Sequence, residues 1–203
     1  RCALNANPNR EAIDARVAAG TLATGGTTVP GVVWIERLAN GHHGVFVSRL
    51  VGGDHFELLN GGRSISSTSR DAAEPDITFV GHTPVITWST VVGGHRRGFV
   101  GHLTPAGRFV LDTPHGIQRT RAGLIAQRLP VSSDCTADPT SSDGDACRGG
   151  GAGTPFFLFA DGRSPHTALF AEKLSLAGNV SPAISLGGVP HRLRANGVVT
   201  IRT

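Results

Sequence analysis

The fold is decided by two stretches that are nearly the same: VPGVVWIERLANGHHGVFVSRL at residues 29–50 and TPVITWSTVVGGHRRGFVGHL at residues 83–103. The matched residues are Pro30 and Pro84, Trp34 and Trp88, Phe46 and Phe99, and Leu50 and Leu103. Their separation falls from 54 to 53 residues across a glycine-rich tip where His42 matches His95. A one-residue deletion at a hairpin tip explains this change, so the two stretches indicate copies of one structural unit.

A third copy follows as TPFFLFADGRSPHTALFAEKL, residues 154–174. It places Phe159 where the earlier copies have tryptophan and Phe170 where they have phenylalanine. Phe159 lies 71 residues after Trp88, because the connection between the second and third copies contains the loop between Cys135 and Cys147. The loop therefore reads as an insertion between repeats.

Each copy contains short segments of β-branched and aromatic residues separated by turn formers, which is the pattern of strands. In the second copy we expect strands at 76–80, 84–88, 97–103 and 108–112. Four antiparallel strands every ~50 residues is the period of a propeller blade, whose two apolar faces are covered by stacking on its neighbours. The sequence therefore predicts an all-β, β-propeller-like fold with three recognisable four-stranded antiparallel blades.

The predicted blades lie near 14–62, 63–121 and 122–186. An N-terminal segment, 1–13, precedes them, and a C-terminal strand region, 187–203, follows. Closed propellers have about four to eight blades, and an open stack leaves a blade face and strand edges uncovered. Self-association that closes a ring is therefore one expectation.

The segments PDITF, TPVITW and GFVGHL, together with SSDC, DGDAC and GTPFFLF, resemble repeats of extracytoplasmic bacterial β-propeller-like proteins. The resemblance covers roughly residues 14–186. It implies a propeller and secretion, and it supplies no catalytic residues.

Cys135 and Cys147 flank a polar loop that cannot order itself by burying side chains. A disulfide between them would restrain it by ~2–3 kcal/mol and indicates an oxidising compartment. We therefore expect a secreted or extracytoplasmic protein. Two unpaired thiols in a flexible loop are the alternative.

The net charge is +4, and the basic residues are scattered along the chain. A protein that binds nucleic acid gathers such residues into a patch, so no nucleic-acid partner is expected. No segment approaches the ~20 apolar residues of a membrane-spanning helix, so no membrane span is expected.

Two sets of residues are candidate metal ligands. His42 and His95 occupy equivalent hairpin tips, where imidazoles of adjacent blades could hold a divalent metal. Asp138, Asp143 and Asp145 place carboxylates around a glycine turn and could hold calcium. The alternative in both cases is a solvated polar surface.

Two glutamates are candidate catalytic residues. Glu172 matches Ser48 and Gly101 in the other copies, so a carboxylate there would be partly desolvated, as a general acid or base requires. Glu36 follows Trp34, and its counterpart is Thr90, so the repeat does not require an acid there. The alternative is a β-bulge that turns the Glu172 side chain outward.

These features favour an extracytoplasmic ligand-binding module that takes a small molecule or glycan where loops gather at the mouth of the ring. One alternative is a metal-assisted hydrolase, with calcium or another divalent metal, acting on a sugar or lactone. A second is a structural fragment that only assembles.

Overall fold

The computed structural model describes residues 4–22, 26–53, 55–80 and 82–116. Beyond these it describes the backbone of four strands, 131–133, 155–163, 166–173 and 184–188. Within this part of the chain the structure is all β, apart from one 3-10 turn at Asn60–Gly62. The predicted all-β class is confirmed. No helix among the described residues is long and apolar enough to cross a membrane.

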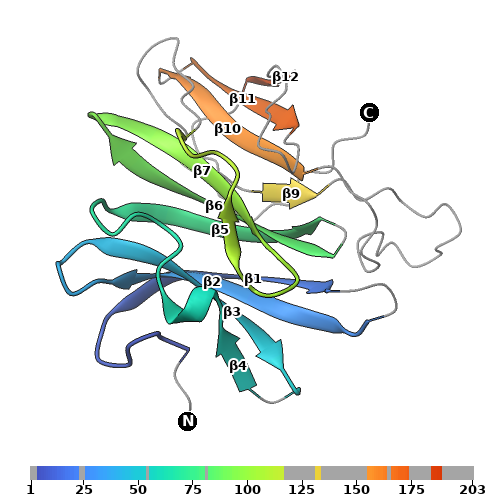
Figure 1. Cartoon of the computed structure of the whole chain (residues 1–203). Coiled ribbons are helices and arrows are strands. Elements are labelled where there is room, and N and C mark those ends of the chain that lie inside the picture. The colour runs from blue at the N-terminus through green and yellow to red at the C-terminus, as the bar shows by residue number, and fades with distance from the viewer. Residues whose placement is uncertain are drawn as a thin grey trace, which may run out of the picture.

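The strands form three antiparallel sheets of four strands each, seen one above another in Figure 1. The first sheet has the order β1-β2-β3-β4, the second β5-β6-β7-β8 and the third β12-β11-β10-β9. Their bounds are β1 Ala12–Thr21, β2 Thr28–Arg37, β3 His43–Val51, β4 His55–Leu58, β5 Ala72–Val80, β6 Thr83–Val92, β7 His95–Leu103, β8 Phe109–Leu111, β9 Val131–Ser133, β10 Pro155–Arg163, β11 His166–Lys173 and β12 Ile184–Gly188. Each sheet is a meander in which sequence neighbours pair.

The register of pairing confirms the repeat alignment. The aromatic pairs are directly opposite each other at equivalent places: Trp34 and Phe46, Trp88 and Phe99, and Phe159 and Phe170. The two tryptophan pairs are also stacked, with ring centroids 6.1 Å and 5.7 Å apart. The three segments are therefore versions of one strand–turn–strand unit.

A β-bulge recurs at the same place in the first strand of two sheets. Asp14 and Ala15 bulge out opposite Trp34, and Glu74 and Pro75 bulge out opposite Trp88. Asp14 and Glu74 have φ of 53° and 54°, a region that residues other than glycine seldom adopt. With its bulge, β5 begins at Ala72, four residues before the strand predicted at 76–80.

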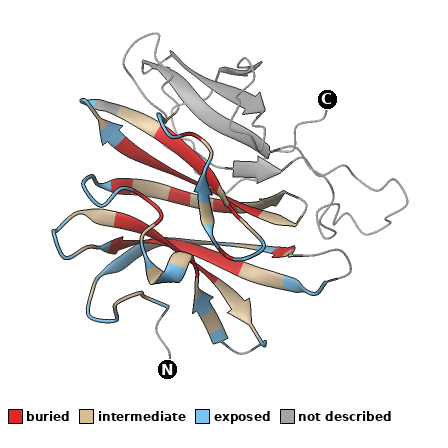
Figure 2. Ribbon diagram, viewed as in Figure 1, coloured by how far each residue is buried: buried red, intermediate tan, exposed pale blue. Residues whose placement is uncertain are grey.

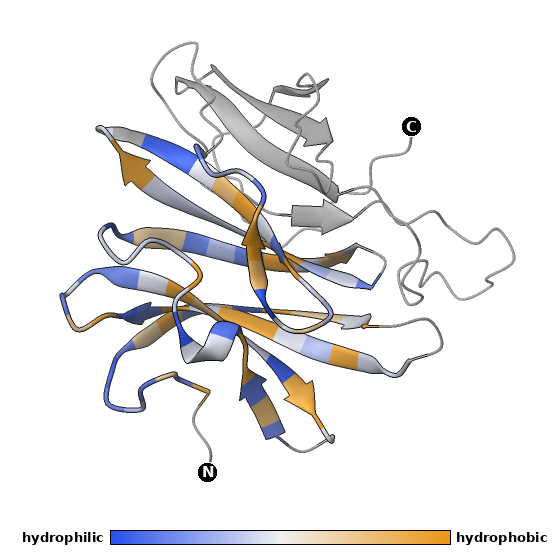
Figure 3. Cartoon of the chain, in the orientation of Figure 1, coloured by the Kyte–Doolittle hydropathy of each residue, from blue (hydrophilic) through white to orange (hydrophobic). Residues whose placement is uncertain are grey.

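The first and second sheets pack face to face, and each contributes a different face to the contact. Because side chains alternate along a strand, each sheet has an aromatic face, which carries its tryptophan, and an opposite face. One core cluster joins the opposite face of the first sheet to the aromatic face of the second. Figure 2 shows buried residues in the strands of both sheets. Its members include Val33, Ile35, Val45 and Val47 from the first sheet and Ile77, Ile86, Trp88, Phe99 and Leu103 from the second. Figure 3 shows the hydrophobic residues of these strands.

The close approach of the two sheets depends on glycine. A Cβ on Gly20 would lie 2.2 Å from the Phe79 ring, and one on Gly31 would lie 3.1 Å from Ile77 Cδ1. Both glycines belong to the first sheet. Their partners, Phe79 and Ile77, belong to β5. Small residues in β1 and β2 thus admit the side chains of β5 between the sheets.

Candidate functional site

A small cavity lies between the first two sheets. Its volume is about 80 Å³, and apolar side chains from both sheets line most of it. They include Val47, Leu59, Ile77, Phe79 and Leu103. The cavity therefore forms where two repeats meet, at the end of the sheets opposite the histidine-bearing hairpin tips.

Polar residues also line this cavity, among them Ser48, Arg49 and His82. Arg49 donates to Glu57 Oε2 from Nε at 3.2 Å and from a terminal nitrogen at 3.1 Å. His82 Nδ1 lies 2.8 Å from Thr21 Oγ1, which joins the β5–β6 turn to the end of β1. An apolar cavity with a few polar groups in its wall has the composition of a ligand pocket, although its size admits only a small ligand.

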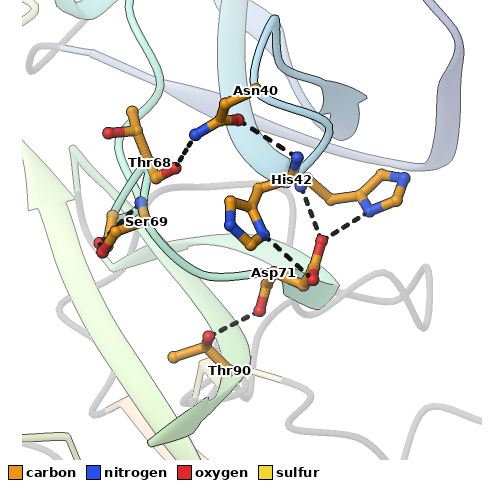
Figure 4. Close-up of polar contacts among 8 residues, drawn as sticks. Asn40, His42, Thr68, Ser69, Asp71 and Thr90 are labelled. Carbon is orange, nitrogen blue, oxygen red and sulfur yellow. Dashed lines mark hydrogen bonds and ion pairs between the residues drawn. The ribbon is translucent and has the colours of Figure 1, made fainter.

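The predicted metal ligand His42 lies in a polar cluster at the β2–β3 hairpin tip (Figure 4). Its Nδ1 lies 3.3 Å from Asp71 Oδ2, and His43 Nδ1 lies 2.9 Å from Asp71 Oδ1. The His43 backbone N–H also donates to Asp71 Oδ1 at 2.9 Å, and Thr90 Oγ1 donates to the Asp71 carbonyl at 2.6 Å. The cluster ties the first sheet to the chain entering the second.

The electrostatics of this cluster favour an ionised carboxylate. The hydrogen bond from the His43 ring, with further contributions from His42, holds the pKa of Asp71 below its usual value and outweighs a smaller effect of burial. The Asp71 side chain is 62 % exposed, so solvent screens these contacts and they contribute little energy. The cluster is therefore a set of weak polar contacts at the surface.

A second histidine–aspartate pair lies on the opposite face of the second sheet. His102 Nδ1 lies 2.9 Å and 3.0 Å from the two oxygens of Asp112. The Asp112 side chain is 5 % exposed, and its burial raises its pKa, against the opposing effect of His102. A buried carboxylate that holds one imidazole nitrogen orients the ring.

The predicted catalytic residue Glu36 anchors the N-terminal segment. Its carboxylate accepts from the backbone N–H of Ala6 at 2.8 Å, from that of Asn7 at 2.9 Å and from Trp34 Nε1 at 3.2 Å. The side chain is completely buried. The structure thus gives this carboxylate an architectural role: it holds residues of the segment over the aromatic face of the first sheet.

The remaining predicted site residues are only partly covered by the structure. Glu172 lies in β11 opposite Phe157, and His95 lies in β7 opposite Val92; their side chains lie outside the described residues. Asp138, Asp143 and Asp145 lie outside the described residues altogether, as do Cys135 and Cys147. Across the residues described, no group of three or more His, Cys, Asp or Glu side chains is placed to hold a metal ion.

Sequence reasoning missed Asp71 and Asp112, the partners of the histidines. The repeat alignment contains a signal for the second: His102 and Asp112 stand where the first sheet has Arg49 and Leu59. His102 and Asp112, which contact each other, therefore both differ from the residues at the equivalent positions of the first repeat. Asp71 gives no such signal, because it precedes the strands that the repeat aligns.

No protein-family model matches this chain, and no curated protein sequence matches it. The class of protein is therefore defined by the fold alone: an all-β protein with repeated four-stranded antiparallel sheets.

Proposed function

We propose that the protein is an extracytoplasmic ligand-binding module of propeller-like blades, which binds a small, mostly apolar molecule between its first two sheets. The cavity of about 80 Å³ at that junction is the observation that carries the proposal. Its apolar wall would contact the carbon skeleton of the ligand, and the side of the wall with Arg49 and His82 would face a polar group.

The propeller-like arrangement is supported by three features. The three repeats share strand order and register, and the first two also share the position of a bulge. The opposite face of the first sheet packs on the aromatic face of the second, and further sheets could be added in the same orientation. The first strands of successive sheets, β1, β5 and β9, lie next to one another, as the innermost strands of blades do.

The volume restricts the ligand to a few non-hydrogen atoms, so the test uses small probes. Amide chemical shifts would be followed by NMR during titration with 1-propanol, propionate and propylamine. Shifts at Val47, Leu59 and Leu103 are expected with at least one probe, because all three residues line the cavity. If none of the probes moves these resonances, the proposal is wrong.

Two substitutions on one strand separate cavity binding from general weak binding. Val47→Ile adds a methylene to the cavity wall and is expected to abolish the response. Val45→Ile is the matched control, because Val45 is equally buried on the same face of β3 but does not line the cavity. Equal responses in both variants would contradict the assignment of the site.

A further inference from the structure

The pair of His102 and Asp112 is more than a surface contact. Both carboxylate oxygens lie within 3.0 Å of His102 Nδ1, so the acceptor fixes a proton on that nitrogen. Nε2 then carries a lone pair and lies on the far side of the ring from the buried carboxylate. The His102 side chain is 21 % exposed, so part of it is in contact with solvent.

Asp112 is itself held firmly by β7. Its backbone N–H donates to the Val100 carbonyl at 2.9 Å, and the next residue, Thr113, accepts the Val100 N–H on its Oγ1 at 2.8 Å. The backbone of Asp112 is therefore fixed, and its side chain loses little conformational freedom when it binds the imidazole. A group that is oriented before it reacts does not have to be ordered during the reaction.

The repeat does not require this pair. Leu59 donates its N–H to Val47 just as Asp112 does to Val100, and it is a core residue. The fold at this position is therefore satisfied by an apolar side chain. A buried carboxylate in its place costs solvation energy and raises the pKa of the group. A buried carboxylate where the first repeat has leucine, placed next to a histidine, indicates a functional role.

We propose that His102, positioned by Asp112, is a general base that hydrolyses small carboxylic esters or lactones. The site is distinct from the cavity between the first two sheets, because His102 lies on the other face of the second sheet from Leu103. Val110 lies directly across the strands from His102 and is 41 % exposed, so it offers an apolar surface to the acyl or alkyl part of the substrate.

The reaction balances without any other reagent than water. Nε2 of His102 takes a proton from water as the water oxygen forms a bond to the carbonyl carbon. The bond from that carbon to the ester oxygen then breaks, and the proton passes from Nε2 to the departing oxygen. The products are a carboxylic acid and an alcohol, and the protein returns to its initial state.

The test is hydrolysis of p-nitrophenyl acetate by the full chain. Wild-type protein is expected to exceed free imidazole at the same concentration, and His102→Gln to lower the protein-dependent rate at least tenfold. His115→Gln is the control, because His115 is exposed, and it should change the rate less than twofold. A wild-type rate no higher than that of imidazole, or an unchanged rate in His102→Gln, would overturn the proposal.

The positioning role of Asp112 needs a readout that stability alone does not change. Ring ¹⁵N chemical shifts should show the proton of His102 on Nδ1 in wild-type protein and a redistributed proton in Asp112→Asn. Asp112→Leu, which restores the residue type of the first repeat, should fold and should also lose at least fivefold in rate. Unchanged ring shifts in Asp112→Asn, or a wild-type rate in folded Asp112→Leu, would contradict the positioning role.

Discussion

Replacing Glu36 by alanine removes the acceptor that joins the N-terminal segment to the first sheet. Three donors lose their partner: two backbone N–H groups, of Ala6 and Asn7, and the indole of Trp34. The two amides can turn to water if the segment detaches, whereas the indole is 3 % exposed and stays unpaired at a cost of about 1–3 kcal/mol. If the segment detaches so far that the indole also reaches water, the tryptophan loses its apolar cover instead, and in either case we expect a loss of about 1–3 kcal/mol.

The assay is urea denaturation followed by tryptophan fluorescence, with hydrogen exchange of the Ala6 and Asn7 amides measured in the native state. Glu57→Ala is the matched control, because Glu57 also binds partners but is 49 % exposed; its salt bridge to Arg49 should be worth about 0–1 kcal/mol. If Glu36→Ala costs less than about 1 kcal/mol, or the two amides exchange as slowly as before, the anchoring role is refuted.

Three further predictions follow from individual groups. Ser48 Oγ is buried with no hydrogen-bond partner in the described structure, so Ser48→Ala should raise stability by up to about 1 kcal/mol in a urea titration, whereas Ser66→Ala, which removes an acceptor of a buried N–H, should lower it by about 1 kcal/mol. The pKa of Asp71 is lower when folded, so its stabilisation is complete above the unfolded value of 3.8 and disappears as the pH falls through the folded value. Asp71→Asn should therefore lower the urea midpoint slightly near neutral pH, by less than about 1 kcal/mol in stability, but not in strong acid; an equal effect at both would contradict this. Cys135 and Cys147 are predicted to form a disulfide, which peptide mass mapping without reductant would detect as a linked pair, and two alkylated thiols would exclude it.

The repeat could be predicted from sequence because few residues carry it. Trp34 and Trp88 are the two tryptophans of the chain, and each is followed by a phenylalanine, 12 residues later in the first copy and 11 in the second. Such spacing can be recognised in the sequence even when the ends of the strands are not known. The bulges at Asp14 and Glu74 were not predicted, because they interrupt the alternation of side chains on which the reading of strands depends.

The candidate sites were harder to predict because they depend on contacts between repeats. Asp71 lies 28 residues from His43, and Ala6 lies 30 residues from Glu36, so neither contact leaves a local pattern. Glu36 was expected to act as a base because the repeat, which has Thr90 at the equivalent position, does not require an acid there. The structure supplies a different explanation for its presence, which is the anchoring of the N-terminal segment beside Trp34.

The central claim is that consecutive repeats become sheets that stack face to face. A NOESY spectrum tests it most directly through the ring of Phe79, which belongs to the second sheet and lies against two glycines of the first. We predict cross-peaks from the Phe79 ring protons to the Hα protons of Gly20 and Gly31. A spectrum with the Trp88 and Phe99 contacts of the second sheet in place, but without these cross-peaks, would contradict the stacking.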